Sequence, residues 1–175
     1  KELNTTTEHH SQSDWKTFLN MGEMLMKQTT IKGQSDFIGE YIHALGPYES
    51  DIWFTEGISH IPGSHNVSLF PPTPPTPLMQ RAAEDKQICV IGKGGNPKQY
   101  KGSELPYMVA FPLVVQDFLL GSIQIVRTDS QPLSISEVEF FDGLAANAAV
   151  ALQISHQTII KNWRLEQLAL VRTVS

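Results

Sequence analysis

The stretch that decides the fold reads Val109-Ala110-Phe111-Pro112-Leu113-Val114-Val115-Gln116-Asp117-Phe118-Leu119-Leu120-Gly121-Ser122-Ile123-Gln124-Ile125. Two apolar runs, residues 106–115 and 118–127, flank a polar pair, which is typical of a two-residue turn between antiparallel strands. A proline inside a strand is tolerated only at an edge, a bulge or a bend, and a glycine there marks a close approach of another backbone. The stretch therefore predicts a central antiparallel hairpin that is irregular near Pro112 and closely approached at Gly121.

The segment after this hairpin predicts one long helix. Ser134 and Ser136 each stand three residues before a glutamate, so that they form overlapping capping boxes with Glu137 and Glu139. The apolar helical pattern then continues to the last residue without a stop signal. We therefore expect residues 161–175 to be a signalling helix that leaves the globular part and leads to an output domain further along the natural chain.

Two helices are expected before the first strand. Residues 1–13 hold one apolar side chain and are expected to be a disordered leader or linker. Asp14 is placed to cap a helix over residues 15–28, and Ser35 is placed to cap a second helix. Gly46 and Pro47 would end that second helix.

The middle of the chain predicts strands, a stiff spacer and a short helix. Residues 51–55 and 66–70 are rich in strand-forming residues and would pair as a hairpin with a long loop. The proline-rich run 71–77 must be extended, because proline fixes φ and restricts the residue before it. A short helix over residues 77–85 and a buried strand over residues 88–91 follow, and a polar loop comes after that strand.

The order of these elements is helix, helix, two strands, helix, three strands and a long helix. This order favours an α+β fold with a central antiparallel β-sheet, helices packed on one side and long terminal helices.

Composition excludes two classes of partner. Thirteen Lys and Arg against eighteen Asp and Glu give a net charge of -5, and no basic run offers a face for nucleic acid. The longest apolar run, Tyr107–Val115, is far shorter than the roughly 18 residues of a membrane-spanning helix, so no membrane insertion is expected. The single cysteine excludes an internal disulfide and favours a cytoplasmic protein.

With these elements in place, the chain resembles the GAF domain family. The hairpin at residues 109–125 is similar to the family's strand-turn-strand, and its continuation is similar to the family's final helix, through Leu133-Ser134-Ile135-Ser136-Glu137, Phe140-Phe141 and the alanine-rich run 144–152. With the two leading helices and the strands at Ile52 and Val67, the resemblance covers residues 14–160. A PAS-like fold, which shares the profilin-like sheet, is the structural rival, but the paired leading helices and the long last helix favour the GAF family.

The resemblance implies a regulatory domain that senses a small molecule in a larger bacterial-type signal transduction protein, such as a two-component system. Members bind cyclic nucleotides, bilins, haem or small metabolites, or nothing known, so the fold names no cofactor. The terminal helices would pair two copies as a homodimer and carry the signal to a histidine kinase, a cyclic-dinucleotide enzyme or a phosphatase.

Two alternatives to sensing remain. The first is a structural dimerisation domain with no ligand, and the second is a redox or enzymatic GAF-like domain. No Ser/His/Asp set, recognisable carboxylate pair or metal-ligand cluster predicts a catalytic or metal site, so this chain is not expected to be an enzyme.

Candidate contacts for the unknown small molecule follow from the pocket that the resemblance implies. Aromatic side chains could line it and polar side chains near the loop 92–102 could orient a ligand, with core packing as the alternative for each aromatic. The predicted ligand-binding residues are Trp53, Thr55, Phe70, Lys93, Tyr100, Tyr107 and Phe111.

Cysteine and histidine favour structural roles. Cys89 lies between two apolar residues of a predicted strand and is interpreted as an inert buried thiol. His60 and His65 flank a short loop without a third ligand close by, and they are interpreted as exposed loop residues rather than a metal pair.

Overall fold

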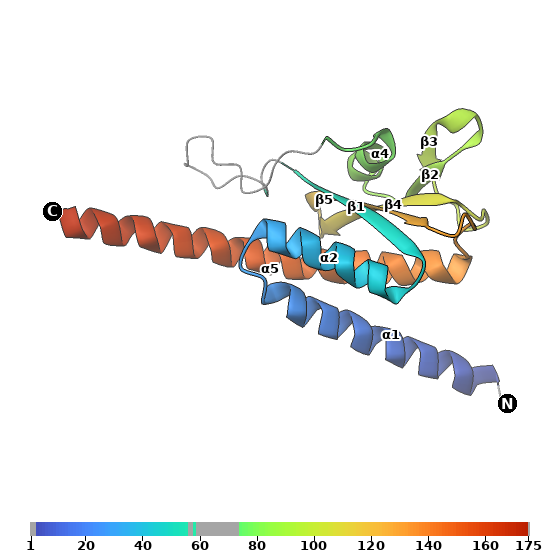
Figure 1. Ribbon diagram of the computed structural model, residues 1–175, viewed down its shortest axis with the longest axis horizontal. Helices are drawn as coiled ribbons and strands as arrows, with labels where there is room; N and C mark the ends of the chain where they lie inside the picture. Colours follow the sequence, from blue (N-terminus) through green and yellow to red (C-terminus); the bar gives the residue numbers. More distant parts are fainter. Residues whose placement is uncertain (1–2, 56–57, 59–73, 175) are drawn as a thin grey trace.

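The computed structural model describes residues 3–55, 58 and 74–174 and shows a five-stranded antiparallel sheet (Figure 1). Its spatial order is β1-β5-β4-β2-β3, and the strands are β1 (Tyr48–Phe54), β2 (Cys89–Ile91), β3 (Pro97–Gln99), β4 (Met108–Val115) and β5 (Phe118–Arg127). A 3-10 turn, η1 (Lys93–Gly95), joins β2 to β3.

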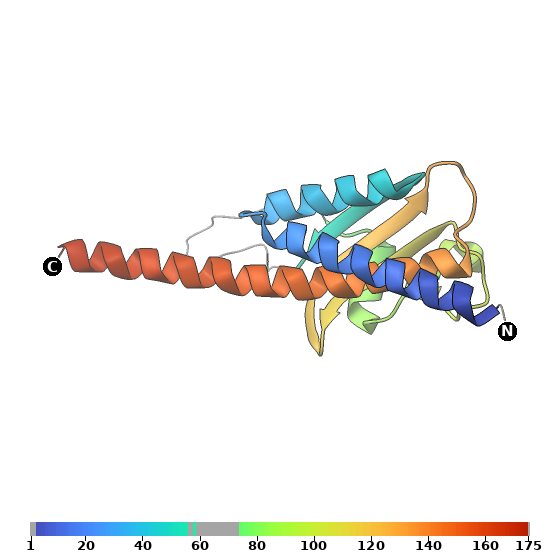
Figure 2. The same cartoon turned by 90° about the horizontal axis from the view of Figure 1, so that it is seen from below.

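The helices form layers on both faces of the sheet. Helices α2 (Ile31–Leu45) and α5 (Ile135–Val174) lie against one face, and α1 (Leu3–Met26) packs along α5 (Figures 1 and 2). The short helix α4 (Pro77–Asp85) lies on the opposite face. The predicted α+β class with long terminal helices is confirmed, and α4 is the helix that is not on the predicted side. The apolar side of α4 makes a second, smaller core with Cys89 and Ala110.

The central hairpin forms as the sequence predicts. Val115 pairs with Phe118 across a two-residue turn, in which Gln116 adopts a left-handed φ of 55°. Leu113 pairs with Gly121 but Val114 pairs with Leu119, so an extra residue bulges out of β5 close to the proline of β4. A Cβ on Gly121 would lie 1.8 Å from the carbonyl oxygen of Trp53, which confirms the predicted close approach.

Successive side chains along each strand point to opposite faces of the sheet, and each face contributes to a separate hydrophobic core. Phe111, Ile123 and their alternate neighbours face α2 and α5 in the main core. Ala110 and Cys89 face α4, and the Cys89 thiol is fully buried, as expected for an inert cysteine. Burial raises the pKa of that thiol.

The two leading helices begin earlier than the sequence predicts. Helix α1 includes residues 3–13 in place of the predicted disordered leader, and Asp14 lies inside this helix rather than at its cap. Helix α2 is capped by Thr30, whose Oγ1 accepts from the Gly33 amide at 3.0 Å, and Ser35 is buried within the helix. Once one helical turn has formed and packed, adding a further residue to the helix costs little free energy. A helix can therefore begin before its best local start signal.

Helix α5 is continuous over 40 residues, or about 60 Å at about 1.5 Å per residue, as predicted. Ser134 forms the capping box: its Oγ accepts from the Glu137 amide at 3.1 Å, and its own amide donates to Glu137 Oε1 at 3.0 Å. Small residues allow α1 to lie close, because a Cβ on Gly143 would lie 2.7 Å from the Phe18 ring. The last part of α5, residues 164–173, is exposed and projects from the globular part (Figure 2).

The remaining segments are partly covered by the described residues. Helix α4 spans the predicted residues, with Thr76 as its N-cap and Pro77 in its first turn. Strand β2 is found at the predicted place, but the loop after it contains β3, which the sequence does not predict. The predicted strand 66–70, its pairing with β1, and the first part of the proline run lie outside the described residues.

Candidate functional site

A cavity beside the sheet lies between α2, β1 and the start of α4. Its volume is about 490 Å³, and it is lined by Ser35, Asp36, Gly39, Glu40, Ser50, Asp51, Ile52, Trp53, Pro74, Thr76 and Met79. We call it the β1 cavity. Cavities of roughly 300 to 1,000 Å³ are typical of small-molecule sites, so this space is large enough for a metabolite.

Thr76 fixes the start of α4 relative to the sheet. Its Oγ1 accepts from the Met79 amide at 3.2 Å, which caps α4, and donates to Gln124 Oε1 of β5 at 2.6 Å. Gln124 is buried, and Ser122, two residues earlier on the same face, is fully buried with no hydrogen-bond partner for its Oγ among the described residues. The face of the sheet next to α4 therefore carries buried polar groups, which is unusual for a plain packing face.

The β1 cavity has an acidic wall. Asp36, Glu40 and Asp51 contribute carboxylates, and none of its described lining residues is basic. Lys32 pairs with Asp36 at 2.7 Å and offsets part of this charge. Coulomb repulsion therefore disfavours anionic ligands here, such as nucleotides, and favours neutral or cationic ones.

A second cavity of about 470 Å³ lies beside the β2–β3 hairpin and the segment that leads into β4. We call it the hairpin cavity. Ile91 and Met108 contribute apolar surface, and Lys93, Lys98 and Tyr107 contribute polar groups. Lys98 also lies 3.4 Å from Glu104.

The predicted ligand contacts do not share one site. Trp53 lines the β1 cavity, whereas Lys93 and Tyr107 line the hairpin cavity. Tyr100 and Phe111 pack into the main core on the helix side of the sheet. Successive side chains of a strand point to opposite faces of the sheet. Phe111 therefore shares the helix-side face with Val109, whereas Ala110 faces α4.

The two remaining predicted contacts are Thr55 and Phe70. Thr55 donates its amide to the carbonyl of Leu120 at 2.9 Å and lines neither cavity. Phe70 lies outside the described residues, as do His60 and His65. Within the described ranges, no group of three His, Cys, Asp or Glu side chains could hold a metal ion.

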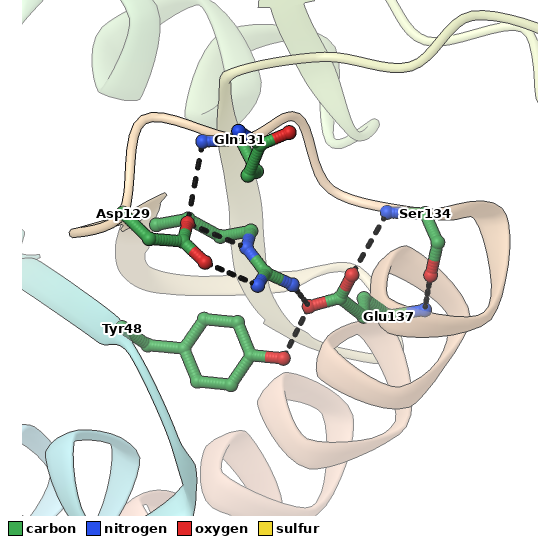
Figure 3. Close-up of polar contacts among 6 residues, drawn as sticks. Tyr48, Asp129, Gln131, Ser134 and Glu137 are labelled. Carbon is green, nitrogen blue, oxygen red and sulfur yellow. Dashed lines mark hydrogen bonds and ion pairs between the residues drawn. The ribbon is translucent and has the colours of Figure 1, made fainter.

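A polar junction connects the start of β1 with the start of α5 (Figure 3). Arg127 donates to Asp129 through Nε and Nη2, at 2.9 and 2.6 Å, and through Nη1 to Glu137 at 2.8 Å. The Tyr48 hydroxyl donates to the same oxygen of Glu137, and the Tyr48 ring contacts Phe141 edge-on at 4.9 Å between centroids. The start of β1 is therefore held, at one end of the sheet, to the end of β5 and the start of α5, although Tyr48 and Glu137 are 89 positions apart.

The junction keeps its two carboxylates ionised. The hydrogen bond from Arg127 lowers the pKa of Asp129 to about 2. Burial alone would raise the pKa of Glu137, but the hydrogen bonds from Tyr48 and Ser134 and the charge of Arg127 outweigh it and lower that pKa. Burial and then the contact with Glu137 raise the pKa of Tyr48 to about 12, so that it remains a donor. The sequence reveals the capping box but not the tyrosine and arginine that join it.

A sequence model described as GAF domain matches residues 25–152, so the chain belongs to the GAF domain family. GAF domains are signalling and sensor domains, and they occur in sensor kinases and phosphotransferases.

Solved structures agree on the fold. A protein from Burkholderia vietnamiensis described as a GAF sensor has a TM-score of 0.57 at 12% identity, over 84% of this chain and 98% of that one. The GAF domain of a phosphoenolpyruvate-protein phosphotransferase from Coxiella burnetii has the same TM-score and identity, over 83% and 95%. The GAF domain of the potassium sensor histidine kinase KdpD from Escherichia coli has a TM-score of 0.50 at 13% identity, over 88% and 96%.

At such low identity, these structures show the shared fold alone. No curated protein sequence matches the chain. Across the described residues, no helix combines the length and the apolar character needed to cross a bilayer.

Proposed function

We propose that this GAF domain senses a small molecule in the β1 cavity and relays its occupancy through α5 to an output module. One observation supports the proposal above all: β1 forms a wall of the cavity and also bonds to the start of α5. Trp53 and Asp51 line the cavity, and Tyr48 at the other end of the same strand donates to Glu137 in the first turn of α5. From Trp53 to Tyr48 the strand spans about 17 Å at about 3.3 Å per residue.

The relay works as a shift between two populated arrangements. A ligand that contacts both α2 and α4 favours the arrangement in which the distance between these two helices lets it contact both at once. Movement of β1 changes the position of Tyr48, and therefore the hydrogen bond that holds the first turn of α5. The ligand shifts the equilibrium only as far as its affinities for the two arrangements differ. In this proposal the domain itself binds rather than catalyses.

The exposed part of α5 would pair two copies of the chain. Leu165, Leu168, Leu170 and Val171 are 54 to 66% exposed, which leaves apolar surface on a helix that projects from the globule. Parallel pairing of two such helices buries this surface and carries changes in α5 onward. The alternative of a dimerisation domain without a ligand depends on this same part of α5.

Trp53 provides a direct test of ligand sensing. In a Trp15→Phe, Trp163→Phe variant, Trp53 is the remaining indole of the three in the chain. We expect a member of a panel of cationic and neutral metabolites to change its fluorescence saturably and to raise the melting temperature, since binding to the folded state stabilises it. Asp51→Asn should weaken that binding, whereas Lys93→Gln, in the hairpin cavity, should not.

Sedimentation completes the test. A Leu165→Glu, Leu168→Glu variant should become monomeric and keep its ligand affinity. If the wild-type chain is a dimer and no panel member binds, the sensing proposal is wrong and the dimerisation alternative is favoured. A wild-type monomer at high concentration that still binds ligand would overturn the pairing through α5.

A further inference from the structure

The β2–β3 hairpin carries the positive charge of an otherwise acidic chain. Residues 86–103 contain four of the thirteen Lys and Arg and no Asp or Glu, which leaves nine Lys and Arg against all eighteen Asp and Glu in the rest of the chain. Figure 1 shows the hairpin on the side of the sheet away from α1 and α5. A molecule that carries negative charge is therefore attracted to this part of the surface, which the terminal helices leave uncovered.

Apolar surface is exposed beside these lysines. Ile91, Leu105 and Tyr107 line the hairpin cavity and are between 42 and 64% exposed. Val90 and Pro106 also line it and are buried, so the apolar surface continues from the walls of the cavity into the protein. Exposed apolar surface with a polar rim is typical of places where another macromolecule docks.

The charged side chains of the cavity favour an anionic occupant. Its described lining residues include two ammonium groups, Lys93 and Lys98, and one carboxylate, Glu104. Glu104 lies 3.4 Å from Lys98 and also accepts from the Lys101 amide, so its charge is compensated within the hairpin region. Lys93 makes no ion pair with any residue that the structure describes. One positive charge is therefore available to a partner beside the apolar surface.

The shape of the cavity favours a peptide that is recognised by its side chains. Small-molecule sites bury about 70 to 90% of their ligand, and a cavity whose apolar walls are this exposed cannot do so. Strand β3 is at the edge of the sheet, but Pro97 has no amide hydrogen, so it disfavours the addition of a further strand. An anionic bilayer is also disfavoured, because it would repel the acidic remainder of the chain.

We propose that the hairpin cavity docks a short acidic segment of a partner protein, in which large apolar side chains stand between carboxylates. The apolar side chains cover Leu105 and Tyr107, and a carboxylate pairs with Lys93. The apolar contacts supply most of the affinity, while the charges speed association and select the partner. This docking depends neither on a ligand in the β1 cavity nor on pairing through α5.

A fluorescein-labelled peptide, Gly-Asp-Glu-Leu-Phe-Glu-Asp, serves as the probe. We expect its fluorescence anisotropy to rise saturably when the chain is added. A peptide with Lys in place of every Asp and Glu should not bind. A peptide with Ser in place of Leu and Phe keeps the charge and should bind at least about fivefold more weakly, because it lacks the apolar contacts.

Lys93→Glu tests the charged rim. It should weaken binding of the acidic peptide about tenfold at about 0.1 M salt, where the screening length is about 10 Å. At about 1 M salt this length is about 3 Å, and the variant should bind nearly as the wild type does under the same conditions. Lys16→Glu makes the same change of charge at an exposed position of α1 and should leave the affinity unaltered.

Leu105→Ser tests the apolar contact. It should weaken binding about fivefold at both salt concentrations, because salt does not screen apolar contacts. Leu105 is 57% exposed, so the melting temperature should not change. Leu168 of α5 has the same exposed fraction and provides the matched control. Leu168→Ser should bind the peptide like the wild type even where it abolishes pairing through α5, which separates this docking from the proposed function.

Several results would each overturn the docking of an acidic segment. Anisotropy that does not saturate, equal binding of the basic peptide, or wild-type affinity in Leu105→Ser would do so. Equal weakening by Lys16→Glu and Lys93→Glu would reduce the effect to net charge. Self-association that Leu105→Ser abolishes would place a second copy of the chain in the cavity. Binding to phosphatidylserine vesicles that requires Leu105, without binding of the peptide, would make the occupant a membrane.

Discussion

Replacing Gly121 by alanine should disrupt the contact between β1 and β5 more than any other single methyl group added at a described glycine. The added Cβ would lie 1.8 Å from the Trp53 carbonyl oxygen, 2.8 Å from its carbonyl carbon and 3.0 Å from the Phe54 Cα. Carbon and oxygen atoms of neighbouring strands normally stay about 3.3 Å apart, so β1 would have to move by about 1.5 Å. All three neighbours are backbone atoms, and none of them can rotate away.

The expected loss is about 3 kcal/mol, near the upper end of the range for overpacked sites. For a chain of this size, that lowers the melting temperature by about 6 to 12 °C. Urea unfolding followed by circular dichroism would measure the free energy directly, provided the slope with urea is unchanged.

Gly39→Ala is the matched control for this substitution. Gly39 lies in α2, and its added Cβ would come no closer than 4.0 Å to the Ser50 hydroxyl. This change should stabilise the chain by about 0.5 to 1 kcal/mol, because alanine favours a helix over glycine. If Gly121→Ala has the same free energy of unfolding as the wild type, the backbone of β1 does not lie against this glycine. The placement of the β1 cavity next to β5 would then be wrong.

Three further predictions concern the cap of α5 and the ionisable groups. Ser134→Ala should cost about 1 kcal/mol, whereas Ser136→Ala should cost less than about 0.5 kcal/mol, because Ser134 is the residue that forms the capping box; equal losses in urea unfolding would contradict this assignment. Asp129 has a lowered pKa, so its stabilising contribution is complete above its ordinary value of 3.8 and is lost as pH falls toward about 2. Asp129→Asn should flatten that part of the acid unfolding curve, and an unchanged curve would show that its pairing with Arg127 adds nothing. Burial lowers the pKa of His156, so stability should decline as pH falls below 6.5, where the unfolded chain takes up a proton first; His156→Gln should remove this decline, and a persisting decline would assign it to another group.

Sequence reasoning succeeded where the deciding interaction is local. The hairpin turn, the capping box at Ser134 and the start of α4 at Pro77 each depend on residues within a few positions of one another. It failed for the start of α2, because Thr30 and Ser35 are both acceptable caps and only packing of the first turn favours one of them. The short strand β3 has no apolar alternation, and pairing with β2 creates it.

The candidate sites were less predictable than the fold. Trp53 and Phe111 are both strand aromatics, yet one lines the β1 cavity and the other is buried under α5. The period of a strand determines which residues share a face, but it does not state which face meets a helix and which meets a cavity. Lys93 and Tyr107 come together only because β2 and β4 are neighbours in the sheet.

The sequence alone determined the elements of this protein: a central antiparallel hairpin, a short capped helix after a proline run, and one long helix that continues past the globular part. Local hydrogen bonds, backbone restrictions and hydrophobic periods specify these features, and all of them act over a few residues. Only the tertiary structure decided which side each strand residue faces, how Tyr48 and Arg127 reach Glu137, and where cavities remain. These features depend on contacts between residues far apart in the chain, such as Tyr48 and Glu137, which are 89 positions apart, and no local pattern encodes which distant surfaces will meet.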